Sequence, residues 1–158
     1  FRVYTSNDPA GTEIAGAVKN VVALAAGMSD GLELGENAKA SIITRGLTEL
    51  VRVGERLGGR RETFFGLAGL GDIVATCAGE LSRNYRAGKM IARGAAAGEV
   101  SGSITAEGLG TAQVLRAYAT AHDLELPITE QVYAVAFGGR APSEAIEVLM
   151  SRSSKREW

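Results

Sequence analysis

The sequence predicts an all-α protein, and three observations support this prediction. Apolar residues recur at steps of three and four along most of the chain, which is the period of a helix with one buried face. Only three prolines interrupt the 158 residues. No segment alternates apolar and polar residues as a half-buried strand does. A chain of this length fits one multi-helix domain with a substantial core.

Two long helices open the predicted domain, over residues 14–29 and residues 37–57. The apolar stripe of the second, which we expect to face the core, consists of Ile42, Leu47, Leu50, Val53 and Leu57. Its charged residues are Lys39, Arg45, Glu49, Arg52 and Glu55. The pair Gly58-Gly59 then ends the helix, as glycine commonly does beyond a helix terminus.

Five shorter helices follow, which brings the expected total to about seven. They are predicted over residues 72–77, 84–97, 106–122, 129–137 and 142–150. A glycine-rich connector precedes the first of them, and residues 98–105 are predicted to form a polar loop. Pro127 and Pro142 lie near predicted helix starts, where proline is best tolerated. The last eight residues, SRSSKREW, are expected to fray.

Composition excludes several classes of function. The net charge of −1 gives no bulk attraction to nucleic acid or anionic membranes. No window is apolar enough for a membrane span, and no signal peptide is visible, so we expect a cytoplasmic protein. A single cysteine, Cys77, and a single histidine, His122, argue against a disulfide and against a metal site. Because the sequence starts at Phe1, we expect a fragment or a processed product.

Lys19 is the most informative single residue, because it is the one charged side chain in the 16 residues of the first predicted helix. An ammonium group in so apolar a segment must be paired, solvated through a cleft or deprotonated. A lysine held in this way can act as a general acid or base. The alternative is a lysine that extends its stem along a buried helix and keeps its charge in water.

The segment GLAGLGD at residues 66–72 has the glycine content of a nucleotide loop but not its pattern. The G-x-G-x-x-G motif would need a glycine where Val74 stands, and no strand is predicted before it. These glycines more plausibly allow two backbones to approach closely and present Asp72 at a helix start. The alternative role for Asp72 is to cap that helix.

The triplet SRN at residues 82–84 opens a predicted helix and forms a candidate anion site. Backbone N–H groups point outward at a helix start, Arg83 can add a two-pronged contact, and Ser82 and Asn84 can donate further hydrogen bonds. The alternative is an ordinary N-cap beside a surface arginine. Glu107 opens another predicted helix, where a carboxylate also serves as first-turn charge.

The segments described above, with several others, occur in the same order as the motifs of one protein family. The ordered strings are DPAGTE from residue 8, GAVKN from 16, GENAKASIITRGLTEL from 35, TFFGLAGLGDIVATC from 63, SRN from 82, AEGLGTA from 106, LPITEQVY from 126 and LMSR from 149. They resemble the C-terminal, substrate-binding half of bacterial NAD(P)-dependent glycerol-3-phosphate dehydrogenase. The resemblance covers nearly the whole chain.

The resemblance implies a role for each candidate residue. Lys19 would be the catalytic acid/base, and the cofactor, NAD or NADP, would lie near Arg83 and Glu107. The substrate-binding residues would be Lys19, Asp72, Ser82, Arg83 and Asn84. Residues 1–158 would form a helical domain similar to the C-terminal domain of 6-phosphogluconate dehydrogenase, without the N-terminal Rossmann domain that binds most of the cofactor.

The resemblance also implies what the whole enzyme does. It would interconvert dihydroxyacetone phosphate and sn-glycerol 3-phosphate, act as a homodimer and support glycerophospholipid synthesis, whereas this chain alone would be inactive. Two alternatives remain open at this point. One is the helical domain of a different dehydrogenase of similar fold, and the other is a non-enzymatic helical module that binds an anion or a partner helix.

Overall fold

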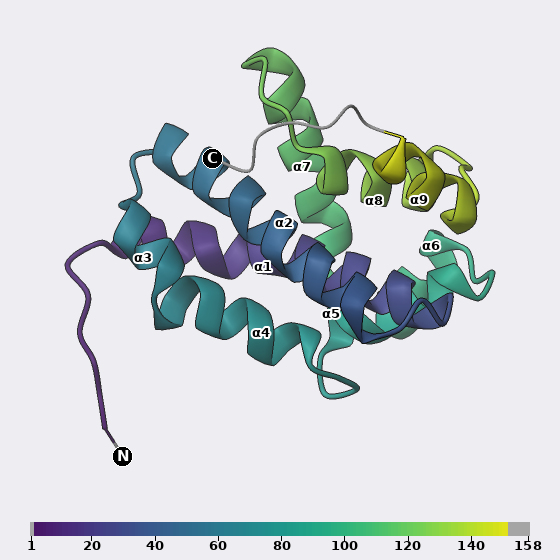
Figure 1. Ribbon diagram of the computed structural model, residues 1–158, viewed down its shortest axis with the longest axis horizontal. Coiled ribbons are helices and arrows are strands. Elements are labelled where there is room, and N and C mark those ends of the chain that lie inside the picture. Colours follow the sequence, from purple (N-terminus) through teal and green to yellow (C-terminus); the bar gives the residue numbers. More distant parts are fainter. Residues whose placement is uncertain (1, 152–158) are drawn as a thin grey trace.

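The structure, a computed structural model, describes residues 2–151 and confirms the all-α prediction (Figure 1). Nearly all of the predicted frayed tail lies outside these residues. The described part contains α-helices, one π-helical turn labelled η1, and no strand. The elements are α1 (Pro9–Gly31), α2 (Glu36–Arg56), α3 (Arg61–Phe65), η1 (Leu67–Gly71), α4 (Asp72–Cys77), α5 (Arg83–Ala92), α6 (Ala97–Ser103), α7 (Glu107–Ala121), α8 (Pro127–Phe137) and α9 (Pro142–Met150).

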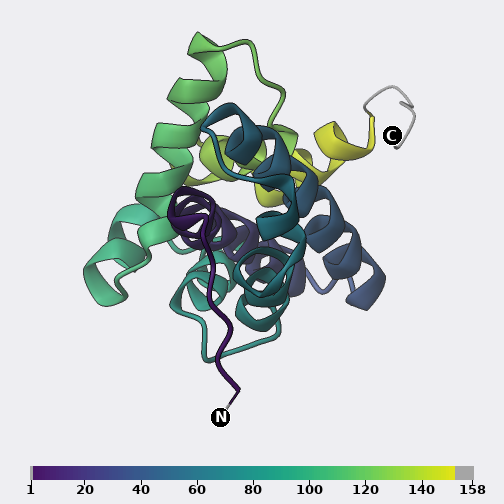
Figure 2. The same ribbon diagram turned by 90° about the vertical axis from the view of Figure 1, so that its left-hand side faces the viewer.

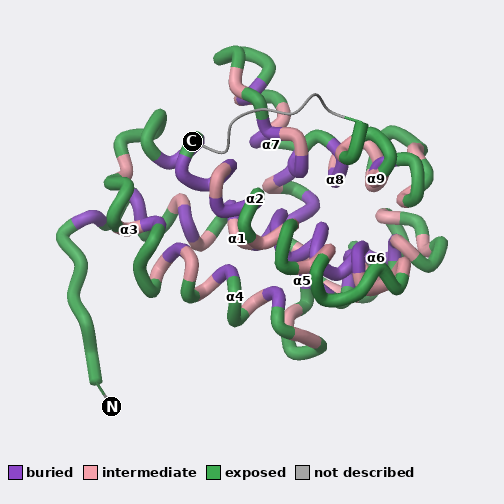
Figure 3. Tube along the Cα trace, in the orientation of Figure 1, coloured by how far each residue is buried: buried purple, intermediate pink, exposed green. Residues whose placement is uncertain are grey.

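Helix α1 lies at the centre of the fold. It packs against α2, α4, α5, α7 and α8, so helices surround it on several sides (Figures 1 and 2). Its second half is almost wholly buried, with Ala23, Leu24 and Ala26 inaccessible to solvent (Figure 3). Small side chains there let the neighbouring helices come close. No helix within residues 2–151 is both long and apolar enough to cross a membrane.

Helix α5 crosses α1 at backbone contact distance, and glycine makes this possible. A Cβ atom at Gly88 would lie 2.0 Å from the carbonyl oxygen of Leu24, and one at Gly27 would lie 1.9 Å from that of Tyr85. Any larger residue at either position would force the helices apart. The crossing therefore fixes the placement of α5, which carries the SRN triplet at its start.

Helix α1 begins earlier than predicted, at Pro9, because Asp8 caps it. The Asp8 carboxylate accepts hydrogen bonds from the backbone N–H of Gly11 (2.9 Å) and Arg60 (2.8 Å) and from the Thr63 hydroxyl (2.6 Å). The Thr63 contact, followed by the two backbone contacts, holds the pKa of this carboxyl below its ordinary value. Asp8 therefore joins the start of α1 to the start of α3.

Two helices occur where none was predicted. The expected helix over residues 84–97 ends at Ala92, because Gly94 takes a left-handed conformation (φ 102°). A new helix, α6, then covers most of the predicted loop 98–105. Its fully buried residue Val100 anchors it, and the Glu99 carboxylate accepts a hydrogen bond (3.3 Å) from the backbone N–H of Ala96. The other addition is α3, directly before the predicted glycine-rich connector.

The prediction for the two faces of α2 was wrong at Glu49 and Leu57. Glu49 is only 4% exposed, and its carboxylate accepts hydrogen bonds from the backbone N–H of Ile128 (2.5 Å) and Thr129 (3.1 Å) and from the Thr129 hydroxyl (2.8 Å). It therefore caps α8 from inside the fold. Leu57, expected in the core stripe, is exposed at the end of α2.

Candidate active site

Lys19 and Asp72 form an ion pair between α1 and α4. The Lys19 Nζ lies 2.5 Å from Asp72 Oδ2, and the two side chains are 21% and 38% exposed. The residues on either side of Lys19 in α1, Val18 and Asn20, are buried. Lys19 is therefore held by a carboxylate at the edge of the core rather than extending freely into water. An external molecule can reach both charged groups.

The glycine-rich segment presents Asp72 at a helix start, as the sequence predicted, and its position there allows the contact with Lys19, which was not predicted. Phe64 is fully buried, and the backbone turns tightly over it, so that a Cβ atom at Gly69 would lie 2.0 Å from the Phe64 carbonyl oxygen. The turn is the π-helical segment η1, and α4 begins directly after it at Asp72. The Asp72 side chain makes no capping hydrogen bond to α4 and instead faces Lys19.

Thr76 is a site residue that the sequence analysis missed. Its hydroxyl donates a hydrogen bond of 3.3 Å to Asp72 Oδ1, while Asp72 Oδ2 accepts from Lys19. Both carboxylate oxygens therefore have partners, which restricts rotation of the group. The available signal was spacing, because Thr76 follows Asp72 by four residues on a predicted helix and such side chains share a face.

The SRN triplet has mixed roles in the structure. The Ser82 hydroxyl accepts a hydrogen bond from the backbone N–H of Tyr85 (3.2 Å), so the alternative role considered for it, the N-cap of this helix, is confirmed. Asn84 is buried, and its Oδ1 accepts from the backbone N–H of Gly108 on α7 (2.9 Å). Arg83 is 54% exposed and reaches solvent. The triplet thus links the start of α5 to the start of α7, and the Arg83 guanidinium remains accessible to solvent.

Arg83 and Glu107 come together where α5 and α7 begin. The Arg83 Nη2 lies 3.7 Å from Glu107 Oε1, and both side chains are more than half exposed. The next residue, Gly108, packs against the backbone carbonyl of Asn20, which follows Lys19 on α1. The contacts of Gly108 with Asn20 and with Asn84 therefore connect the Arg83–Glu107 pair to the Lys19–Asp72 pair.

The other residues considered in the sequence analysis have contacts that suit structural roles. Cys77 is fully buried, and burial raises the pKa of its thiol to about 12, so it stays protonated at neutral pH. His122 follows the last residue of α7, and its ring lies against Tyr118. Arg60 contacts Asn7 and Arg61 pairs with Glu55, as expected for arginines with intramolecular partners. No group of His, Cys, Asp and Glu within residues 2–151 could hold a metal ion.

This arrangement can exchange a proton and bind an anion. A lysine paired with a carboxylate can donate a proton to an oxygen that approaches it, and an exposed arginine offers planar hydrogen bonding to a phosphate. The fold and site define a helical domain that presents a lysine–carboxylate pair and, at the start of α5, an exposed arginine.

Comparison with known proteins gives the family. The family model described as NAD-dependent glycerol-3-phosphate dehydrogenase C-terminus matches residues 8–147. The glycerol-3-phosphate dehydrogenase (NAD(P)+) of Nostoc sp. is 49% identical, with 100% of this chain and 52% of that protein covered. The corresponding protein of Gloeobacter violaceus is 52% identical, covering 99% and 52%.

A solved structure agrees with this assignment. The crystal structure of glycerol-3-phosphate dehydrogenase from Coxiella burnetii superposes with a TM-score of 0.90 at 44% identity, covering 96% of this chain and 47% of that one. The chain belongs to the NAD-dependent glycerol-3-phosphate dehydrogenase family, and it matches the C-terminal region of that family. It spans about half the length of the curated relatives.

Proposed function

We propose that residues 1–158 are the substrate-binding and catalytic-lysine domain of an oxidoreductase that interconverts dihydroxyacetone phosphate and sn-glycerol 3-phosphate. The observation that carries this proposal is the accessible Lys19–Asp72 pair, in which Lys19 is the one charged side chain of residues 14–29 of α1. In the working enzyme, an N-terminal dinucleotide-binding domain would precede this one. That domain would hold most of the NAD or NADP.

Lys19 would donate and accept the proton of the reaction. The bound nicotinamide supplies hydride chemistry that no side chain of this domain can supply. Reduction of the ketone leaves negative charge on the carbonyl oxygen, and the Lys19 ammonium would stabilise that charge and donate its proton. In the reverse direction the neutral amine would take the hydroxyl proton. Asp72, held by Thr76, would keep the Lys19 amine aimed at the reacting oxygen.

The start of α5 would hold the phosphorylated end of the substrate or the cofactor. Arg83 is exposed and can bind a phosphate with two parallel hydrogen bonds. The Ser82 hydroxyl already accepts from Tyr85, so its own proton is free to donate outward. Asn84 uses its oxygen for Gly108, which leaves the amide N–H₂ for a ligand. Glu107, paired with Arg83, can accept hydrogen bonds from cofactor groups.

The test is an enzyme that joins this chain to a dinucleotide-binding half, such as that of the Nostoc sp. relative. NADH or NADPH oxidation with dihydroxyacetone phosphate should be rapid in the unchanged enzyme. Lys19→Met keeps most of the stem volume but removes the proton, and should lower kcat by about 10²–10⁴. Circular dichroism checks that the variant is folded. A kcat within a few-fold of the unchanged enzyme would assign Lys19 a merely structural role.

We also propose a cytoplasmic homodimer that supplies sn-glycerol 3-phosphate for glycerophospholipid synthesis. Exposed apolar side chains such as Phe137, Val148 and Met150 on α8 and α9 favour subunit contacts through this domain.

A further inference from the structure

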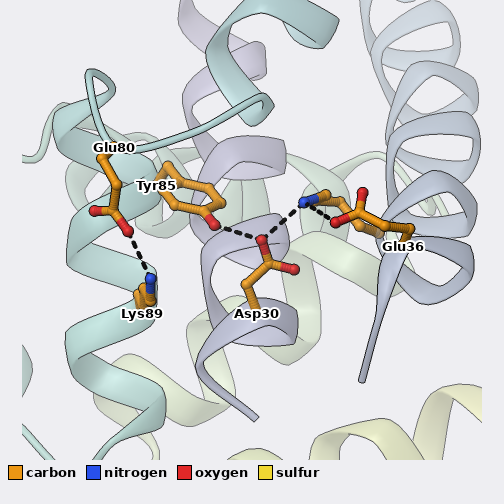
Figure 4. A network of polar contacts seen from close by, with 6 residues as sticks. Asp30, Glu36, Glu80, Tyr85 and Lys89 are labelled. Atoms are coloured by element: carbon orange, nitrogen blue, oxygen red, sulfur yellow. Dashed lines mark hydrogen bonds and ion pairs between the residues drawn. The ribbon is translucent and has the colours of Figure 1, made fainter. Parts of the chain in front are cut away.

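A polar network joins the first turn of α5 to the last turn of α1 (Figure 4). The Tyr85 hydroxyl donates a short hydrogen bond to Asp30 Oδ2, in the last turn of α1. Lys39 of α2 donates to the same oxygen at 2.9 Å and to Glu36 Oε1 at 3.0 Å. We refer to Asp30, Lys39 and Tyr85 as the α5 latch.

The α5 latch is well shielded and keeps one protonation state. Tyr85 is buried, and the side chains of Lys39 and Asp30 are 14% and 17% exposed. Burial raises the pKa of Tyr85 to about 12. Burial opposes ionisation of Asp30, but hydrogen bonds from Tyr85 and Lys39 outweigh it and hold the pKa of this carboxyl below its ordinary value. Tyr85 therefore remains a donor and Asp30 a charged acceptor across the physiological range.

Tyr85 is also part of the turn that carries the anion-binding residues. It follows Asn84 directly, and its backbone N–H is capped by Ser82. Its backbone carbonyl lies against Gly27 where α1 and α5 cross. The ring, hydroxyl and backbone of one residue thus fix the turn on which Arg83 stands. Through Asn84 and Gly108, the same turn fixes the start of α7.

A second contact restrains the loop before the SRN triplet. Lys89 Nζ lies 2.5 Å from Glu80 Oε1 and 6.0 Å from the centre of the Tyr85 ring (Figure 4). The loop therefore folds back on α5 one turn beyond Tyr85. With the α5 latch on one side and this ion pair on the other, the triplet has little freedom to move.

We infer that Tyr85 and Asp30 are positioning residues for substrate binding, because the α5 latch sets the place of Arg83 and Asn84 relative to α1. This inference rests on the proposed function. Asp30 lies eleven residues after Lys19, about 16 Å along the helix axis. Loosening the latch therefore displaces the anion-binding turn and leaves the Lys19–Asp72 pair in place. Substrate affinity should fall while proton transfer continues.

The test uses Tyr85→Phe in the enzyme joined to a dinucleotide-binding half. This change removes the hydroxyl and keeps the buried ring. We expect the KM for dihydroxyacetone phosphate to rise about tenfold, because small displacements of a positioning group weaken a multi-point contact. The kcat should stay within about twofold. Tyr118→Phe is the matched control, since Tyr118 lies on α7 eleven residues beyond Glu107 and its KM should not change.

Two changes at Asp30 sharpen the test. Asp30→Ala also removes the Lys39 contact, so it should raise KM at least as much as Tyr85→Phe, and the double variant should be no worse than Asp30→Ala alone, because the Tyr85 hydroxyl acts through Asp30. Asp30→Asn retains an oxygen acceptor and should recover part of the loss. An unchanged KM in Tyr85→Phe, with only a lower melting temperature, would overturn the inference and leave the latch purely structural.

The result separates failure of this inference from failure of the proposed function. If the unchanged enzyme turns over and Lys19→Met does not, while Tyr85→Phe has a normal KM, only the positioning role is wrong. If the unchanged enzyme does not reduce dihydroxyacetone phosphate, the proposed function is wrong, and the inference built on it is overturned too.

Discussion

Asp72 and Glu49 show how the surroundings of a carboxylate determine its role in this domain. Asp72 is partly exposed and faces a lysine, whereas Glu49 is enclosed and faces the N-terminus of α8. Desolvation raises the pKa of Glu49 to about 7, although hydrogen bonds from Ile128 and Thr129 oppose the rise. A structural carboxylate therefore titrates near neutral pH, with consequences for stability.

Glu49 should make the fold less stable as the pH rises toward neutrality. Its folded pKa of about 7 exceeds the ordinary value of 4.5, so the folded chain holds an extra proton between these pH values. The associated stability is complete below about pH 4.5 and is lost as the pH rises through 7. We expect the melting temperature to fall by about 5–10 °C from pH 5 to pH 7.5.

Glu49→Gln should flatten that dependence, because the amide does not titrate. Thermal melts of this chain at several pH values give the measurement. The carboxyls of Asp8 and Asp30 have lowered pKa values, so their contributions are lost only in more acidic solution and do not overlap this window. An equally steep dependence in the variant would place the titrating group elsewhere.

Arg83 should be irreplaceable by lysine if it binds phosphate. A planar guanidinium makes two parallel hydrogen bonds, and a lysine ammonium cannot reproduce that geometry. Loss of such a contact costs about 1.5–3 kcal/mol, so Arg83→Lys should raise KM for the substrate or cofactor about ten- to a hundredfold. The exposed neighbour Arg86 gives the control. Equal effects of Arg83→Lys and Arg86→Lys would leave SRN as a helix cap alone.

At the level of the helices, the α1–α5 crossing governs the site. Lys19 lies on α1 and Arg83 opens α5, so the separation of these helices sets the distance between the proposed acid–base group and the proposed anion-binding group. Gly27 and Gly88 hold the two backbones in contact. Packing at this crossing therefore affects both stability and the geometry of the site.

Gly88→Ala should destabilise the fold markedly. The new methyl group would meet the Leu24 carbonyl at 2.0 Å, and backbone cannot move aside as a side chain can. We expect a loss of about 1–3 kcal/mol or more, measured by urea unfolding. Gly110→Ala on α7 is the control, since its methyl group would meet no atom within 4 Å. That change should be neutral or stabilising, because alanine favours helix.

At the scale of the whole molecule, the most important property is that the chain covers about half the length of its curated relatives. The described residues form helices only, with none of the parallel strands on which a dinucleotide-binding domain depends. We expect this chain to fold alone but to show no dehydrogenase activity. Absorbance of NADH and NADPH with dihydroxyacetone phosphate provides the assay, and turnover by the purified chain would contradict the proposed domain role.

If the proposed homodimer is correct, this domain should form a dimer by itself. Sedimentation of the chain over a range of concentrations should show a dimer that dissociates on dilution. The exposed apolar residues of α8 and α9 give the contact a physical basis. A monomer at every concentration would place the subunit contact outside these residues.

Much of this protein follows from local sequence alone. Helical periodicity predicted the class of fold and seven of the helices, because burying one face of a helix requires a period that neighbouring residues reveal. The isolated charge of Lys19 and the placement of Asp72 after close-packing glycines were also visible, as was the capping role of Ser82. The ordered motifs led to the family that the comparisons confirm.

Only the tertiary structure decided which distant residues meet. Lys19 and Asp72 lie 53 residues apart, and Glu49 meets the start of α8 across 79 residues. The Tyr85–Asp30 contact likewise crosses between helices. A polar residue on a helix can face solvent or a partner, and its own spacing does not distinguish the two. The choice depends on how neighbouring helices cross, which is set by packing throughout the core.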